Sequence, residues 1–67
     1  MPDTPITFEN VYVLRDGSMG FWCSMRGREV FIGSNLPLQG TTVRSAGDQG
    51  TLVLPRWFVQ DQGIEVP

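Results

Sequence analysis

Residues 20–33 read GFWCSMRGREVFIG, two runs of apolar, β-branched and aromatic residues separated by Arg26-Gly27. Runs of this composition on either side of a short glycine-containing break are typical of a β-hairpin. We therefore expect strands over 20–25 and 29–32, with the chain reversing at 26–27.

The length of the hairpin loop decides which side chains share a face. If Arg26-Gly27 is a two-residue loop, Trp22 lies opposite Phe31 and Ser24 opposite Glu29. The other face is then wholly apolar and consists of Phe21, Cys23, Val30 and Ile32. One face would be core and the other would present an aromatic pair.

A three-residue loop that includes Met25, with Gly27 in a bulge, is the alternative. It groups Trp22 with Val30 and Ile32, because a slip of one residue exchanges every side chain between faces. Turn chemistry favours this longer loop, since arginine is a poor first residue of a two-residue primed turn. The apolar pattern favours the shorter loop, which we predict.

Upstream, residues 7–14 are rich in β-branched and aromatic residues and predict a first strand, with a turn at Asp16-Gly17. Residues 1–5 contain two prolines and no periodic pattern, so we expect a flexible N-terminal arm. Within the strand, Phe8 and Tyr12 share one face, whereas Val11 and Val13 take the other. A strand that is apolar on both faces favours a protein interface, of which a homodimer is one form.

Downstream, Pro37 donates no ladder hydrogen bond, so residues 36–40 are expected to form a crossing loop. Two further strands are expected at 41–44 and 51–54. Pro55 suits a helix start, and residues 57–62 fit one or two helical turns that Gly63 would close in the left-handed conformation.

These elements predict one all-β domain over 6–67, a five-stranded SH3-like barrel with a short C-terminal helix; an OB-like barrel is the alternative. The chain has 67 residues. A chain of this size buries only about 60% of the surface that its unfolded form exposes, so oligomerisation would add stability.

The sequence contains no histidine, no lysine and one cysteine, Cys23. Most catalytic and metal-binding sites require these residue types, so most such sites are excluded. A serine nucleophile has no base to activate it, and a zinc site or a phosphate-binding loop lacks its ligands. We expect Cys23 to be a small buried hydrophobe. The remaining acid/base candidates, which we expect to be solvated, are Asp16, Glu29, Asp48 and Asp61. The sequence predicts no enzyme activity, no cofactor and no metal.

The charge balance is mildly acidic, with five arginines, seven carboxylates and a net charge of −2. It lacks the basic excess that nonspecific DNA binding usually draws on, yet excludes neither protein nor nucleic acid as a partner. A lone cysteine forms no internal disulfide, and no apolar run approaches the roughly 18 residues of a membrane span. The N-terminal residues also lack the pattern of a signal peptide. We expect a protein of the host-cell cytoplasm that does not bind membranes.

The second hairpin is the best candidate surface. In either register an aromatic pair remains on its second face beside arginines, and the expected partner-binding residues are Trp22, Phe31, Arg26, Arg28 and Arg44. Such a face could anchor a protein partner or stack the bases of a single-stranded nucleic acid. The alternative is that either the 36–38 loop or the helix at 57–62 covers this face. Because Trp57 and Phe58 are neighbours on that helix and point in different directions, we expect one of the two to be buried.

Two segments resemble a known group of domains. Residues 47–58, GDQGTLVLPRWF, followed by Gly63-Ile64, are similar to the ending of short, largely uncharacterised phage and bacterial domains. Residues 26–34, RGREVFIGS, resemble their charged hairpin, with Phe31 in place of a tryptophan, Gly33 of a proline and Ser34 of a lysine. The resemblance implies a phage or prophage accessory domain, sometimes found beside DNA-processing proteins, and assigns no functional residues.

Together these features predict a non-enzymatic phage or mobile-element protein that docks on a host protein or complex as an adaptor or inhibitor. A module that binds single-stranded nucleic acid is one alternative. A structural homo-oligomer is the other.

Overall fold

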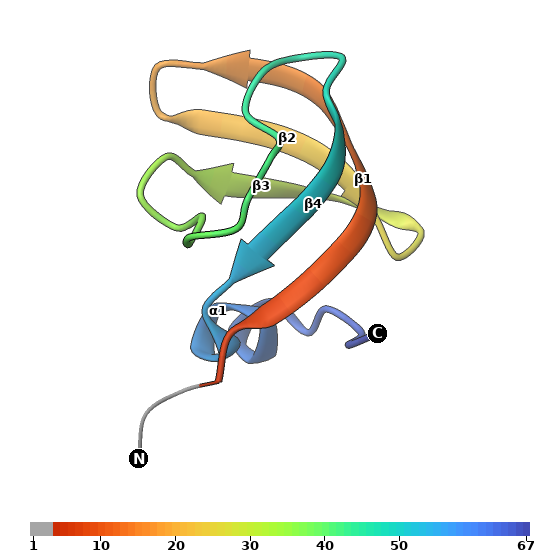
Figure 1. Ribbon diagram of the computed structural model, residues 1–67, viewed down its shortest axis with the longest axis vertical. Helices are drawn as coiled ribbons and strands as arrows, with labels where there is room; N and C mark the ends of the chain where they lie inside the picture. Colours follow the sequence, from red (N-terminus) through yellow and green to blue (C-terminus); the bar gives the residue numbers. More distant parts are fainter. Residues whose placement is uncertain (1–3) are drawn as a thin grey trace.

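In the computed structural model, residues 4–67 are described, and they form one antiparallel sheet with a single short helix (Figure 1). Residues 1–3 of the expected N-terminal arm lie outside the described residues. The elements are β1 (Ile6–Gly17), β2 (Gly20–Met25), β3 (Arg28–Gly33), β4 (Gln49–Leu54) and α1 (Arg56–Gln62). The strand order is β3-β2-β1-β4, and the predominantly β fold is confirmed.

The β2–β3 hairpin has the shorter loop, as predicted. Trp22 faces Phe31 and Ser24 faces Glu29 across the two strands. Arg26 and Gly27 form the turn with φ angles of 51° and 81°, the left-handed values that a type I′ turn requires at both positions. Arginine adopts this unfavourable conformation because the longer loop would place Phe21 and Cys23 on the opposite face from Val30 and Ile32 and so divide the apolar core face.

A β-bulge in β1 changes which side chains face the core. The pairing of β1 with β4 shifts between Phe8 and Val11, and Asn10 lies there with a φ of 61°. Asparagine tolerates this left-handed conformation better than most residues. Because of the extra residue, Phe8 and Val11 are both buried while Tyr12 is exposed. The prediction that Phe8 and Tyr12 share a face is therefore wrong, and β1 has one core face only.

The first hairpin turns later than expected. Asp16 and Gly17 continue β1, and Gly17 pairs with Gly20, so the turn consists of Ser18 and Met19. The expected turn at Asp16-Gly17 is wrong because the β1–β2 ladder extends past the apolar run that marked the strand.

The expected strand at 41–44 does not form, although this segment lies along the edge of β4. Thr42 N–H donates to the carbonyl of Thr51 at 2.9 Å. In return, however, Thr51 N–H donates to the Thr42 hydroxyl and Val53 N–H to the Thr41 hydroxyl, both at 3.0 Å. Side-chain oxygens thus replace the carbonyls of a fifth strand. The described residues form four strands instead of five, and β3 and β4 end the sheet without pairing with each other, so a closed barrel is not seen.

The core lies on one side of the curled sheet. The segment between β3 and β4 crosses this side and α1 closes one end of it (Figure 1). The crossing loop at 36–40 is confirmed as irregular, and Leu36 packs against the core. The buried core residues are Ile6, Phe8, Val11, Val13, Phe21, Cys23, Met25, Val30, Ile32, Val43, Leu52, Leu54, Phe58, Val59 and Ile64.

Helix α1 ends as the sequence predicts. Gly63 has a φ of 67°, its N–H donates to the carbonyl of Gln60, and Ile64 N–H donates to that of Val59. This pattern is a Schellman motif, which folds Ile64 back into the core. The helix buries Phe58 and leaves Trp57 54% exposed, so the expected division between these neighbours is confirmed.

The close contact of β2 with β3 predicts a strong dependence of stability on Gly20. A Cβ added to Gly20, whose φ is 153°, would collide with the backbone of Ile32 and Gly33, whereas one added to Gly17 meets nothing within 4 Å. We expect Gly20→Ala to lower the free energy of unfolding by about 2–4 kcal/mol, and the matched control Gly17→Ala to change it by less than about 1 kcal/mol. Urea denaturation followed by tryptophan fluorescence measures both. Equal effects would contradict the packing described for Gly20.

Candidate binding surface

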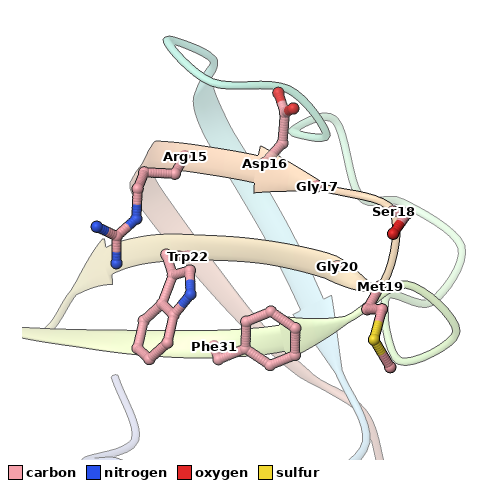
Figure 2. Close-up of a pocket in the computed structure, with 8 residues that line it drawn as sticks. All are labelled: Arg15, Asp16, Gly17, Ser18, Met19, Gly20, Trp22 and Phe31. Carbon is pink, nitrogen blue, oxygen red and sulfur yellow. The ribbon is translucent and has the colours of Figure 1, made fainter.

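Trp22 and Phe31 lie side by side on the outer face of the sheet, the face turned away from the core (Figure 2). Their ring centroids are 5.4 Å apart and their planes are tilted by 58°. Trp22 is 38% and Phe31 40% exposed. Neither the 36–38 loop nor α1 covers them, because both lie on the core side. The interpretation of this pair as a covered packing face is therefore wrong.

A second β-bulge places a cation over the tryptophan. The pairing of β1 with β2 shifts between Val13 and Arg15, so Arg15 instead of Leu14 lies opposite Trp22. The Arg15 guanidinium carbon is 5.4 Å from the centroid of the Trp22 ring. A cation–π contact at an exposed site is worth about 0.5–1 kcal/mol. Arg15, Trp22 and Phe31 thus form a row across β1, β2 and β3.

Met19, in the turn between β1 and β2, extends this row at the end of the sheet. It is 78% exposed, and Figure 2 shows it beside Phe31. A hollow of about 360 Å³ is lined by Arg15, Met19, Trp22, Phe31 and the intervening residues 16–18 and Gly20. We call Arg15, Met19, Trp22 and Phe31 the aromatic face.

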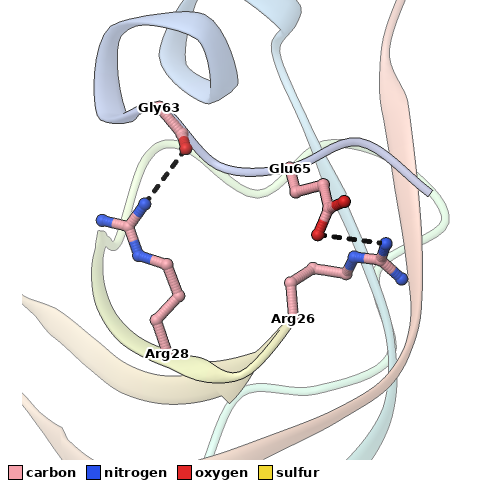
Figure 3. A network of polar contacts seen from close by, with 4 residues as sticks. All are labelled: Arg26, Arg28, Gly63 and Glu65. Atoms are coloured by element: carbon pink, nitrogen blue, oxygen red, sulfur yellow. Dashed lines mark hydrogen bonds and ion pairs between the residues drawn. The ribbon is translucent and has the colours of Figure 1, made fainter.

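Arg26 and Arg28 are not part of the aromatic face. Arg28 lies two residues before Val30 on β3 and therefore shares its core-side face. There its Nη1 donates to the carbonyls of Gln62 and Gly63 at 3.1 Å each. Arg26 Nη2 lies 3.5 Å from Glu65 Oε1 (Figure 3). Both arginines contact the C-terminal segment, and Arg28 places its positive charge beside the free carbonyls at the C-terminal end of α1.

Arg44 is also separate from the aromatic face. It lines a smaller hollow of about 100 Å³ together with Phe21, Ser34 and Pro37 among others. Of the five expected partner-binding residues, the structure brings together Trp22 and Phe31 only. Arg15, which sequence reasoning missed, takes the place of the other arginines, and no sequence signal marks the bulge that puts it there.

The candidate carboxylates do not converge on a catalytic or metal site. Asp16 accepts a 2.6 Å hydrogen bond from Ala46 N–H. Asp48 accepts 2.9 Å bonds from the N–H groups of Ser45 and Arg44, and these bonds lower its pKa below the ordinary value of 3.8. Among residues 4–67, no three His, Cys, Asp or Glu side chains gather where they could hold a metal ion. Asp16 and Asp48 instead order the 44–48 loop.

Cys23 is fully buried, as expected for a small hydrophobic residue in the core. Burial raises the pKa of its thiol from 9.0 to about 11, and its Sγ lies 3.9 Å from Met25 Sδ. The residue is therefore a protonated thiol at neutral pH, without the thiolate character that nucleophilic chemistry requires.

Comparison with protein-family models, with curated proteins and with solved structures gives no match. The resemblance to phage domains therefore stays a prediction. No helix among residues 4–67 has the length and apolar character needed to cross a membrane.

The burial of Cys23 predicts slow alkylation of the native protein. Its pKa of about 11, against 9.0 for an exposed thiol, lowers the thiolate fraction about a hundredfold before steric protection is counted. We expect iodoacetamide at about pH 8 to react at least about a hundredfold more slowly with the native chain than with the same chain in urea. Mass spectrometry gives both rates. Equal rates would show that β2 opens readily.

The hydrogen bonds of Asp48 predict a dependence of stability on pH. Because its folded-state pKa is lowered, the carboxylate stabilises the fold above the unfolded-state value near 3.8, and this contribution is lost as the pH falls through the folded-state pKa. We expect Asp48→Asn to reduce stability at neutral pH and to flatten its decline between about pH 5 and pH 2. Asp61→Asn is the control, because the Asp61 carboxylate accepts a hydrogen bond from the side chain of its neighbour Gln62. Denaturation series across this pH range would contradict the assignment if both variants behaved alike.

Proposed function

We propose that this chain is a non-enzymatic binding module that docks its aromatic face on a partner protein. The observation that carries the proposal is the exposed Trp22–Phe31 pair, with the Arg15 guanidinium over the Trp22 ring. Tryptophan and arginine are the residue types most enriched among those that dominate the energy of protein interfaces. Side chains held on paired strands also lose little conformational freedom when a partner binds.

The neighbouring side chains support an interface larger than the aromatic pair. Tyr12 and Leu14 on β1 are 43% and 36% exposed, and Met19 continues the apolar surface at the hairpin end. Single exposed apolar residues are ordinary, but a group that spans three adjacent strands is typical of an interaction site. Met19 is flexible enough to adapt to a partner's shape.

Binding of single-stranded nucleic acid is the second candidate, favoured by stacking rings beside a guanidinium. Such binding usually follows the phosphate backbone with several cations. Of the three arginines on the second hairpin and beside Trp22, Arg26 and Arg28 are engaged with the C-terminal segment, which leaves Arg15. The net charge of −2 also opposes phosphate binding. These observations favour a protein partner.

The resemblance of residues 26–34 and 47–58 to phage domains supports a more specific form of the proposal. In that form the partner is a host protein or complex in the cytoplasm, and the chain acts on it as an adaptor or inhibitor. The segment that lies along β4 would then be the counterpart of the missing strand of an SH3-like barrel.

A pull-down from host lysate tests the proposal, with three tagged variants compared with the unaltered chain. We expect a defined protein complex that survives nuclease treatment and persists between about 50 and 200 mM salt. Trp22→Ala and Phe31→Ala should each weaken its capture by at least about tenfold. Trp57→Ala is the matched control, because Trp57 is the more exposed tryptophan and lies on α1, outside the aromatic face.

Circular dichroism and urea denaturation establish that each variant is folded before its capture is compared. Recovery of partners that disappear with nuclease, or with salt, would replace the proposal with nucleic-acid binding. A complex that Trp57→Ala weakens as much as Trp22→Ala would move the interface to α1.

A further inference from the structure

Strand β3 forms an edge of the sheet with unpaired backbone groups. The β2–β3 ladder continues beyond the strands, where Ser34 N–H donates to the carbonyl of Met19 at 3.0 Å. Because hydrogen-bonded pairs alternate along an antiparallel ladder, the groups of Arg28, Val30 and Ile32 point towards β2. The backbone N–H and C=O groups of Glu29 and Phe31 point outward from the edge of the sheet, away from β2. They have no hydrogen-bond partner among residues 4–67.

The opposite edge of the sheet is different. The outward N–H groups of Thr51 and Val53 on β4 donate to the hydroxyls of Thr42 and Thr41, and both of their carbonyls accept backbone N–H groups from the segment alongside. This edge is therefore closed to another strand. Open edges readily pair with a further chain, so β3 is where the sheet can be extended.

The side chains of β3 define what such a strand would carry. Glu29 and Phe31 are both exposed, and alternation places them on the outer face, next to Ser24 and Trp22. Directly opposite residues on neighbouring strands contact each other, and opposite charges or paired apolar groups stabilise them. A complementary strand therefore has an apolar side chain opposite Phe31 and a cationic one opposite Glu29.

A second copy of this chain is a poor occupant of the same edge. Two copies could pair their β3 strands around a two-fold axis so that every outward N–H and C=O group of Glu29 and Phe31 is bonded. That register places Glu29 of each copy directly opposite Phe31 of the other, a carboxylate against a phenyl ring. A register centred on Glu29 opposes two carboxylates, which is destabilising. A register centred on Phe31 needs the carbonyl of Gly33, which already accepts Leu36 N–H at 3.0 Å.

We propose that β3 binds an extended segment of a partner protein as an additional antiparallel strand, with an apolar residue opposite Phe31 and Lys or Arg two residues later opposite Glu29. The inference rests on the proposed function, because it takes the partner to be a protein. It adds the chemistry of the recognised segment: backbone hydrogen bonds supply affinity, and the alternating apolar and basic side chains supply specificity. The added strand would also lengthen the aromatic face beyond Phe31.

A blocked peptide, Thr-Thr-Phe-Thr-Lys-Thr-Thr, tests the proposal by NMR titration of the labelled chain at up to millimolar concentration. We expect amide shifts concentrated at 28–33. Replacing the peptide lysine with glutamate should weaken binding by at least about fivefold, and Glu29→Lys should reverse that preference. N-methylation of the peptide Phe and Lys should abolish binding, because their N–H groups face β3. N-methylation of the Thr residues on either side of the Phe should leave binding intact, because their N–H groups point away.

The absence of shifts in β3, or equal effects of the two methylation patterns, would overturn strand addition. Concentration-dependent shifts in β3 without peptide would replace the partner strand with a second copy. These failures are distinguishable from failure of the proposed function. If a partner protein is captured through Trp22 while the peptide leaves β3 unchanged, the function stands and this inference fails. If the peptide binds but no partner depends on Trp22, the reverse holds.

Discussion

The cross-strand register of β2 and β3 determines both the core and the aromatic face. With Arg26 and Gly27 as the whole turn, Phe21 and the alternate residues of both strands enter the core, and Trp22 meets Phe31 on the outer side. A slip of one residue would place Trp22 on the same face as Val30 and Ile32 and separate it from Phe31. The cost of the left-handed arginine in the turn is small beside the apolar burial that this register secures.

The two bulges of β1 adapt a single long strand to two partners. The bulge at Asn10 returns Phe8 and Val11 to the same face. The first half of β1 pairs with β4 and the second half with β2. The bulge beside Leu14 moves Arg15 over Trp22. Bulges re-aim side chains in this way at many binding sites. Here the position of the cation on the aromatic face depends on one additional residue in the strand.

The two edges of the sheet differ in whether their outward backbone groups are hydrogen-bonded, because a chain segment lies beside β4 and none pairs with the outer edge of β3 among the described residues. Threonine hydroxyls from 41–42 satisfy β4, while the backbone of Glu29 and Phe31 on β3 remains unpaired among the described residues. The open edge borders the aromatic face, so a partner strand and a partner surface could be recognised together. Arg26 and Arg28 contact the C-terminal segment, away from the aromatic face.

Local patterns in the sequence determined the hairpin at 20–33, the crossing loop at Pro37, the burial of Cys23, and the helix end at Gly63, because each depends on neighbouring residues: alternation, a missing N–H, or a left-handed glycine. The exposed Trp22–Phe31 pair followed from that alternation. Tertiary structure alone decided the bulges in β1, the place of Arg15, and the loss of a strand at 41–44. Each of these reflects competition between distant groups for one hydrogen bond or one face of the sheet, which a local pattern does not encode.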